Sequence, residues 1–222
     1  MPVQQPEIRW SAANSEAAQE RDWKTSLPLL ATDRTILRGL AAADAPSLLE
    51  NVSDAQVLQY LAASPSTVDG FRRFIRWTQR ERHRGTHVCY GVVPRATGRV
   101  AGIVQGWPVE RDFSVAEWGF VLGRAHWGTG LFVDAARLFL SFTFDGLGVQ
   151  RLEARAVDLN GRGNGALRKL GATREGVLRS AFQGEHARFD HVMWSMLAED
   201  WAKSAGDPGA AARGSDEYVC ER

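Results

Sequence analysis

Cysteine is scarce in this sequence, and the two that occur, Cys89 and Cys220, are far apart. Cys89 lies in an apolar, strand-like pattern and Cys220 stands near the end of the sequence, so we expect no disulfide between them. A buried thiol packs as a small apolar side chain, and this interpretation of Cys89 is favoured over that of a catalytic nucleophile.

Long apolar runs and an excess of one charge are also absent. No run approaches the roughly 20 residues that a membrane-spanning helix needs, and the N-terminus lacks the basic-then-apolar pattern of a secretory signal. The formal net charge of +1 gives no argument for binding nucleic acid or an anionic membrane. We therefore expect a cytoplasmic protein with neither nucleic acid nor a membrane as partner.

The histidines do not predict a metal site. His83, His87, His186 and His191 have no metal-ligand spacing relative to the cysteines or the carboxylates. We expect no metal ion to be needed.

Enough hydrophobic residues are present for one good core. They make up 44% of the 222 residues, and charged residues make up 24%. We expect one domain over residues 27–201. Residues 1–26 are polar and Ala-rich and predict an N-terminal extension, whereas residues 202–222, rich in Ala, Gly and charge, predict a disordered tail.

Residues 115–144 predict a strand, a glycine turn and a long helix. Large apolar residues alternate with Glu117, Gly119 and Val121, as in a two-sided strand, until Gly123 ends the run. From Gly130 onward, apolar residues recur at helical spacing.

The turn before this helix is the first candidate site. Gly128 and Gly130 leave bare backbone N–H groups at the helix N-terminus, where they have no partner within the helix. Such a terminus can bind phosphate oxygens. An ordinary glycine turn is the alternative.

The remaining chain predicts an α+β domain, a mixed sheet with helices on both faces. Asp44 and Thr67 are expected helix N-caps. Strands are expected near residues 35–40, 87–93, 99–107, 113–122, 151–157, 173–182 and 188–197, and helices near 45–51, 55–61, 68–84, 130–144 and 160–170.

The helix expected over residues 68–84 is rich in arginine. A solvated helix face is the favoured interpretation. Some of these arginines, Arg73 and Arg76 among them, could instead line the entrance for a substrate with a carboxylate.

Residues 127–131, followed by Ala135-Ala136-Arg137, resemble motif A of the GNAT acyl-CoA acyltransferases, most closely the RimJ/RimL-like branch. The resemblance covers roughly residues 27–201. One position departs from the family pattern, because Ala125 stands where a Gln or Arg is usual, with Arg124 one step away. Further motifs follow in the order of that branch: Arg151-Leu-Glu-Ala-Arg155, Asn160, Lys169-Leu-Gly171, Glu175-Gly-Val-Leu-Arg179 and Asp200-Trp201.

The resemblance implies the GNAT fold, a mixed, mostly antiparallel sheet whose strands four and five splay apart around acyl-CoA. It also implies an N-acetyltransferase that moves an acetyl group from acetyl-CoA to a primary amine by direct attack in a ternary complex. The acceptor is either a protein N-terminal α-amine or a small-molecule amine, and the protein a monomer or a homodimer.

The resemblance also assigns contacts to the co-substrate. Backbone groups of Phe120, Val121 and Leu122 would pair with the pantetheine amides. Trp127, Gly128, Thr129, Gly130 and Leu131 would wrap the pyrophosphate. Asn160 would contact the pantetheine arm, with Asn164 nearby, although Asn160 is equally suited to capping a helix.

Glu117 is the predicted general base, because its place on the strand should partly desolvate it and raise its pKa. A structural carboxylate or a substrate anchor is the alternative. No general acid is evident, since Gly163 and Arg168 occupy the positions where the family has Ser and Tyr. Two other functions compete: a non-catalytic acyl-CoA-binding module, and a Rossmann-type dinucleotide binder, which the missing third glycine disfavours.

Overall fold

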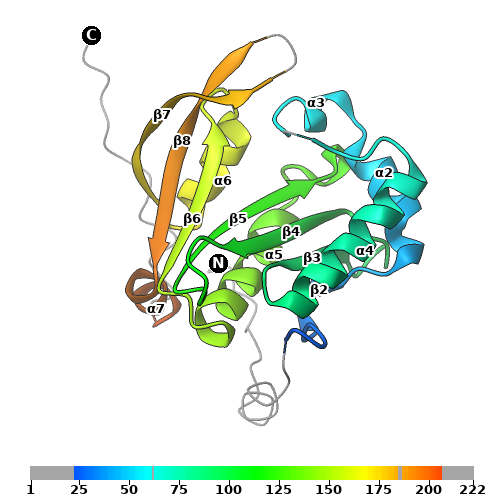
Figure 1. Cartoon of the computed structure of the whole chain (residues 1–222), viewed down its shortest axis with the longest axis horizontal. Helices are drawn as coiled ribbons and strands as arrows, with labels where there is room; N and C mark the ends of the chain where they lie inside the picture. Colours follow the sequence, from blue (N-terminus) through cyan, green and yellow to red (C-terminus); the bar gives the residue numbers. More distant parts are fainter. Residues whose placement is uncertain (1–22, 62, 185–186, 207–222) are drawn as a thin grey trace, which may run out of the picture.

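The structure, a computed structural model of the chain, describes residues 23–61, 63–184 and 187–206 (Figure 1). The described strands form one sheet in the order β1-β2-β3-β4-β5-β6-β8-β7. All neighbours are antiparallel except β5 and β6, which are parallel, so the predicted mixed, mostly antiparallel sheet is confirmed. The strands are β1 (Leu30–Ala31), β2 (Thr35–Gly39), β3 (Val88–Pro94), β4 (Gly102–Pro108), β5 (Val115–Leu122), β6 (Arg151–Val157), β7 (Thr173–Gln183) and β8 (Arg188–Leu197).

Helices cover both faces of this sheet, as predicted (Figure 1). One face packs against α2 and α4 through a buried cluster that includes Leu48, Ile75 and Ile103. The other face packs against α5 and α6 through a larger cluster. The helices are α2 (Ala45–Val52), α3 (Ala55–Leu58), α4 (Val68–Arg84), α5 (Leu131–Ser141), α6 (Gly161–Lys169) and α7 (Ala198–Gly206).

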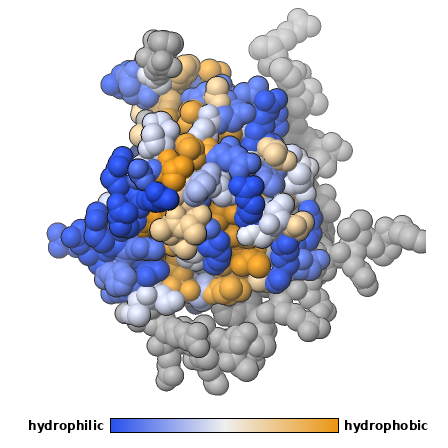
Figure 2. Space-filling view, turned by 90° about the vertical axis from the view of Figure 1, so that its right-hand side faces the viewer, coloured by the Kyte–Doolittle hydropathy of each residue, from blue (hydrophilic) through white to orange (hydrophobic). Residues whose placement is uncertain are grey.

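Seen from the side that carries α2 and α4, the surface is mainly hydrophilic, with hydrophobic residues showing between the charged ones (Figure 2).

Among the described residues, every helix is too short or too polar to span a bilayer.

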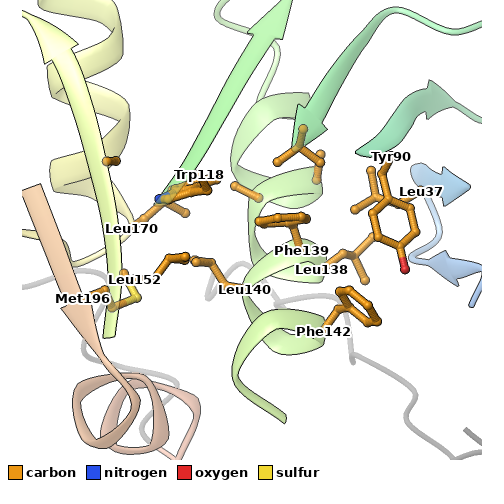
Figure 3. Close-up of a cluster of buried hydrophobic side chains, with 14 of the residues drawn as sticks. Leu37, Tyr90, Trp118, Leu138, Phe139, Leu140, Phe142, Leu152, Leu170 and Met196 are labelled. Carbon is orange, nitrogen blue, oxygen red and sulfur yellow. The ribbon is translucent and has the colours of Figure 1, made fainter. Parts of the chain in front are cut away.

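Aliphatic side chains and aromatic rings together build the larger core between α5 and the sheet (Figure 3). Phe139 of α5 is 1% exposed. Its ring stacks on Trp118 of β5 at 5.7 Å between centroids and meets Tyr90 of β3 edge-on at 6.3 Å. This helix therefore fixes β3 and β5 relative to one another.

Strands β5 and β6 pair only at their beginnings. Val115–Glu117 lie opposite Arg151–Glu153, and the ladder stops there although both strands continue. Each strand keeps its other neighbour, because β4 pairs with β5 as far as Leu122 and β8 pairs with all of β6. The predicted splay is therefore present, with Glu117 at its apex.

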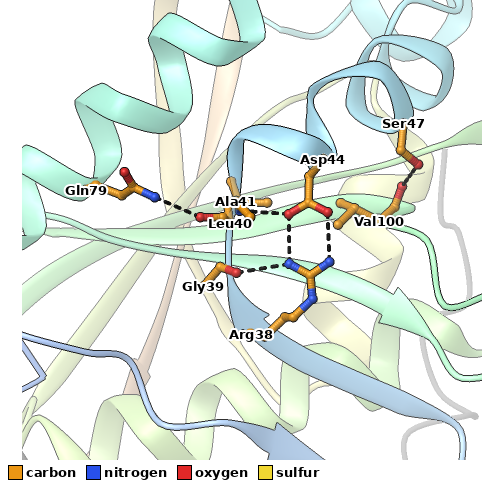
Figure 4. Close-up of polar contacts among 8 residues, drawn as sticks. All are labelled: Arg38, Gly39, Leu40, Ala41, Asp44, Ser47, Gln79 and Val100. Atoms are coloured by element: carbon orange, nitrogen blue, oxygen red, sulfur yellow. Dashed lines mark hydrogen bonds and ion pairs between the residues drawn. The ribbon is translucent and has the colours of Figure 1, made fainter.

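Polar contacts dock the first helices onto the sheet (Figure 4). Arg38 of β2 donates two hydrogen bonds of 2.7 Å to Asp44, whose carboxylate also accepts from the Ala41 N–H. Ser47 of α2 donates to the Val100 carbonyl at 2.8 Å, and Gln79 of α4 to the Leu40 carbonyl at 2.9 Å. Asp44 stands at the predicted N-cap position of α2, but its side chain makes no capping bond, because its carboxylate is bound by Arg38 and the Ala41 N–H.

Other caps and boundaries follow local chemistry. Thr67 caps α4 as predicted, since its hydroxyl accepts from the Gly70 N–H. The expected helix over 130–144 changes at Phe142 into a π-helical turn, Phe142–Gly146. Helix α7, which the sequence pattern did not predict, packs Trp201 against Phe144 at 5.9 Å between ring centroids. The expected tail, residues 202–222, begins too early, because residues 202–206 belong to α7. Residues 1–22 of the expected extension 1–26, and residues 207–222 of the tail, lie outside the described residues.

Phe139→Ala should lower the free energy of unfolding by about 3–5 kcal/mol, the usual cost of deleting a buried ring. Leu29→Ala is the matched control, because Leu29 is 66% exposed and should change stability by no more than about 0.5 kcal/mol. Urea denaturation followed by circular dichroism measures both. Equal effects of the two substitutions would contradict the placement of Phe139 at the centre of the core.

Candidate functional site

The splay between β5 and β6 is hollow. A cavity of about 620 Å³ lies between the two strands, the glycine turn before α5 and the start of α6. Arg155, Arg162 and Lys169 lie in its wall, and none of the described residues that line it carries a carboxylate. The cavity is therefore suited to a ligand with several negative charges.

The glycine turn at one end of this cavity has the predicted form. Gly128 and Gly130 have φ values of 73° and 84°, in the left-handed region that other residues rarely adopt. Gly130 directly precedes α5, so the first N–H groups of the helix lack helical partners. Arg34 donates to the Thr129 carbonyl at 2.8 Å, which ties the turn to the start of β2.

Most of the predicted contact residues meet at this cavity, but three do not line it. Thr129 lies within the glycine turn and Leu131 directly follows it, but only Gly128 and Gly130 of this segment form the cavity wall. Asn164 lies behind the wall. The predicted residues that line the cavity are Phe120, Val121, Leu122, Trp127, Gly128, Gly130 and Asn160.

Strand register decides which backbone groups of β5 face the cavity. The Gly123 N–H donates to the Ala101 carbonyl, and at the other end the Val109 N–H donates to the Val115 carbonyl. Bonding alternates along an antiparallel ladder, so Val121 directs its N–H and C=O towards β4. Phe120 and Leu122 direct theirs towards the splay. The expectation that the Val121 backbone faces the ligand is therefore wrong.

Trp127 closes one side of the cavity. Its indole N–H donates to the Leu122 carbonyl at 2.8 Å, so this carbonyl already has a partner. The guanidinium of Arg162 lies 4.8 Å from the centroid of a Trp127 ring, a cation–π contact that holds the cation at the cavity wall. Sequence reasoning missed Arg162. The sequence indicated Arg162 only as a basic residue in the first turn of the helix capped by Asn160.

The two asparagines have different positions. Asn160 caps α6, since its side-chain oxygen accepts from the Gly163 N–H at 2.9 Å, and it also lines the cavity. Asn164 is buried, donates to the Val157 carbonyl and accepts from the indole N–H of Trp194 at 2.8 Å. These bonds engage both ends of the Asn164 side chain in the fold. The expectation that Asn164 contacts the ligand is therefore wrong.

Glu117 lies at the apex of the splay, on the last paired rung with Glu153. Its side chain is 15% exposed, and burial, the largest influence, raises its pKa as predicted. Arg155, whose guanidinium is 3.5 Å from the carboxylate, and a hydrogen bond from Trp107 lower this pKa, whereas the charge of Glu153 raises it. Glu117 is thus a partly desolvated carboxylate between opposing charges.

These opposing charges make a testable pair. Arg155→Gln should raise the pKa of Glu117 further, and Glu153→Gln should lower it, because each substitution removes one of the two charges. Carbon NMR titration of the side-chain carboxyl measures both, with the Glu117 resonance assigned by its loss in Glu117→Gln. Shifts of the same sign in the two variants would contradict this arrangement of charges.

Comparison with known proteins agrees with this architecture. Residues 34–173 match the model of the acetyltransferase (GNAT) domain family. The chain is 28% identical over 174 residues to the uncharacterized N-acetyltransferase p20 of Bacillus licheniformis, with 78% of this chain and 98% of that protein covered.

Two solved structures share the fold. A GNAT-family acetyltransferase from Bacillus anthracis superposes with a TM-score of 0.69 at 19% identity, over 78% of this chain and 99% of that one. Mycobacterium smegmatis RimJ in complex with CoA-disulfide gives 0.69 at 17% identity, over 78% of this chain and 88% of that one. With its splayed parallel pair and the match over residues 34–173, the chain belongs to the GNAT acetyltransferase family and is an N-acetyltransferase.

Proposed function

We propose that this protein moves an acetyl group from acetyl-CoA to a primary amine, by direct attack of the amine while both substrates are bound. The observation that carries the proposal is the arrangement of the splay. A glycine turn suited to phosphate stands at one end of the cavity. The partly desolvated carboxylate of Glu117 lies on the last paired rung of the splay, next to the residues that line the cavity rather than among them.

The cavity fits the donor on three counts. A Cβ at Gly128 would have no heavy atom within 4 Å, so the turn leaves open space in front of the N-terminus of α5. Arg162 and Lys169 supply positive charge in the cavity wall, and Arg162 compensates for Ala125 at the position where the family has Gln or Arg. The RimJ structure that shares this fold holds CoA-disulfide, which supports a CoA donor here.

The pantetheine arm would lie along β5. Beyond Glu117 this strand has no β6 partner, so the Phe120 N–H and C=O and the Leu122 N–H face the opening. An amide chain laid there would pair with the strand edge as another strand would. An N–H group of the same edge would polarise the thioester carbonyl and stabilise the negative charge that develops on its oxygen.

Glu117 would act on the acceptor. An ammonium cannot attack, so the amine must first lose a proton, and the carboxylate takes it directly or through a water. The neutral nitrogen then bonds to the thioester carbon, the carbon–sulfur bond breaks, and the nitrogen gives up its second proton to the departing thiolate or to water. The thiol of CoA has a pKa near the cysteine value of about 8.5, so its thiolate can leave without a general acid to protonate it.

Two classes of acceptor fit this chemistry, a protein N-terminal α-amine and a small-molecule amine. A protein α-amine has a pKa near 8, against about 10.4 for a lysine, so it needs only a weak base. The resemblance of the sequence to the RimJ/RimL-like branch suggests an acceptor of this kind but does not decide between the two classes. A small-molecule amine fits the same chemistry.

Gly128→Val should weaken acetyl-CoA binding by about 10- to 100-fold, because it strains a left-handed residue and fills the space over the helix N-terminus. Gly98→Val is the matched control, since Gly98 also has positive φ and open space but lies in the β3–β4 turn. Calorimetric titration measures both. No binding to the wild type, or equal loss in both variants, would refute the proposed cradle.

Glu117→Gln should lower kcat/KM for the amine by about 10²–10⁴-fold while acetyl-CoA still binds with wild-type affinity. Because the pKa of Glu117 is raised, the wild-type rate should fall as pH drops through a value above that of an ordinary glutamate. Stopped assays of CoA thiol release give both results, with Glu110→Gln in the exposed β4–β5 turn as control. Tight acetyl-CoA binding without thiol release from any amine would favour the non-catalytic module instead.

A further inference from the structure

A second hollow, with mostly aromatic walls, lies on the opposite face of the sheet from α5. It measures about 450 Å³ and sits between α4 and the adjoining ends of β3 and β4. We call it the aromatic chamber. Its lining residues are Phe74, Trp77, Glu81, Thr86, His87, Gln105 and Trp107.

The rings of this chamber form a continuous series from the helix to the sheet. Phe74 and Trp77 of α4 stack at 6.0 Å between centroids, and Trp77 meets His87 at 4.8 Å. His87 lies parallel to Trp107 of β4, with 4° between the ring planes at 6.2 Å. Such flat walls favour another planar ring, because offset-stacked and edge-on aromatic pairs are worth more than their buried area alone.

His87 contributes an uncharged ring at neutral pH. It is buried, and burial lowers its pKa to about 4. Its Nε2 has no hydrogen-bond partner among the described residues. That nitrogen is itself buried, so His87 contributes a flat, uncharged ring to the wall, beside the polar side chains of Glu81, Thr86 and Gln105.

The chamber connects with the candidate catalytic residue through β4. Trp107 is the cross-strand partner of Glu117, and its side chain lowers the pKa of that carboxyl group. Gln105 lines both the chamber and the cavity of the splay. Gly119 faces Gln105, and a Cβ there would lie 3.5 Å from the Trp107 ring, so glycine leaves space beside that ring. A molecule in the chamber would thus reach towards Glu117 from the side opposite the donor.

Charge at the chamber mouth selects against a cationic occupant. Glu81 is the carboxylate in its lining, but Arg84 donates to it at 2.7 Å and Thr86 at 2.9 Å. Arg80 lies close enough to lower its pKa together with these bonds. The negative charge of Glu81 is therefore already compensated, and the chamber suits a neutral ring.

We propose that the aromatic chamber binds an aryl group carried by the amine acceptor, so that the preferred acceptor is a primary arylalkylamine. This proposal rests on the proposed N-acetyltransferase function. The aryl ring lies in the aromatic chamber against the rings of Trp77 and Trp107, and the amine extends past Gln105 to Glu117.

The first experiment compares three amines in the thiol-release assay with acetyl-CoA. 2-Phenylethylamine carries the ring, 2-cyclohexylethylamine has similar size without aromaticity, and n-propylamine has neither. The expected kcat/KM for 2-phenylethylamine exceeds that for n-propylamine at least about tenfold, and that for the cyclohexyl amine about 2- to 10-fold. Equal values for 2-phenylethylamine and n-propylamine overturn the proposal and leave the acetyltransferase function intact.

Variants of α4 then locate the preference. Trp77→Ala should reduce the 2-phenylethylamine preference to within about twofold with KM for acetyl-CoA unchanged, and Trp77→Phe should keep most of it. Trp77 is 39% exposed, so its loss leaves the core in place. Arg76→Ala, at the exposed neighbouring position, is the control and should retain the preference. A preference that survives Trp77→Ala places the ring elsewhere and overturns the proposal.

Binding measured without turnover separates this proposal from the function on which it rests. Calorimetric titration of 2-phenylethylamine into the full chain saturated with CoA should give a Kd about tenfold weaker in Trp77→Ala than in the wild type. If no amine is acetylated but this difference is found, the enzymatic function fails and the aryl site stands. If 2-phenylethylamine binds both proteins equally or not at all, the aryl site is refuted.

Discussion

The early end of the β5–β6 ladder is the constraint on which the site depends. Parallel pairing holds the two strands at Val115–Glu117 and Arg151–Glu153, and beyond that rung each strand is bound only by its other neighbour. A gap inside a sheet normally leaves backbone groups without partners, which is costly when they are buried. Here the Trp127 indole satisfies the Leu122 carbonyl, and the groups still facing the gap are those that a bound amide chain could use.

Side-chain patterns predicted the elements well but not the direction of backbone groups. The start of α4 followed from Thr67, because an N-cap is a local signal, and the structure shows that Gly85 ends the helix in a left-handed conformation. Alternation showed that Glu117 and Val121 share a face, yet it could not show that the Val121 N–H points to β4, which depends on the register with Ala101 and Ile103.

Contacts between distant segments account for the other differences. Asn164 looked free to meet a ligand, but its partner is Trp194 on β8, a pairing that no local pattern reveals. Asp44 precedes a helix as an N-cap does, but its carboxylate accepts two hydrogen bonds from Arg38 on β2 and makes no capping bond. Arg162 gained its position only when α6 folded against Trp127. The glycine turn was predictable because its geometry is a property of residues adjacent in the chain.

Glycines on β4 and β5 explain how one short sheet segment can serve two hollows. A Cβ on Gly102 would overlap the Val121 carbonyl oxygen, so glycine permits the close approach of β4 to the end of β5. Gly119, between Glu117 and Val121 on the same face, leaves room beside the Trp107 ring. The two glycines therefore leave the fewest side-chain atoms in the part of the sheet where donor and acceptor would have to meet. Glu117 stands at that place with Trp107 on one side and Arg155 on the other. A carboxylate so placed has a raised pKa, and its neighbours Arg155 and Trp107 line the cavity of the splay and the aromatic chamber, respectively.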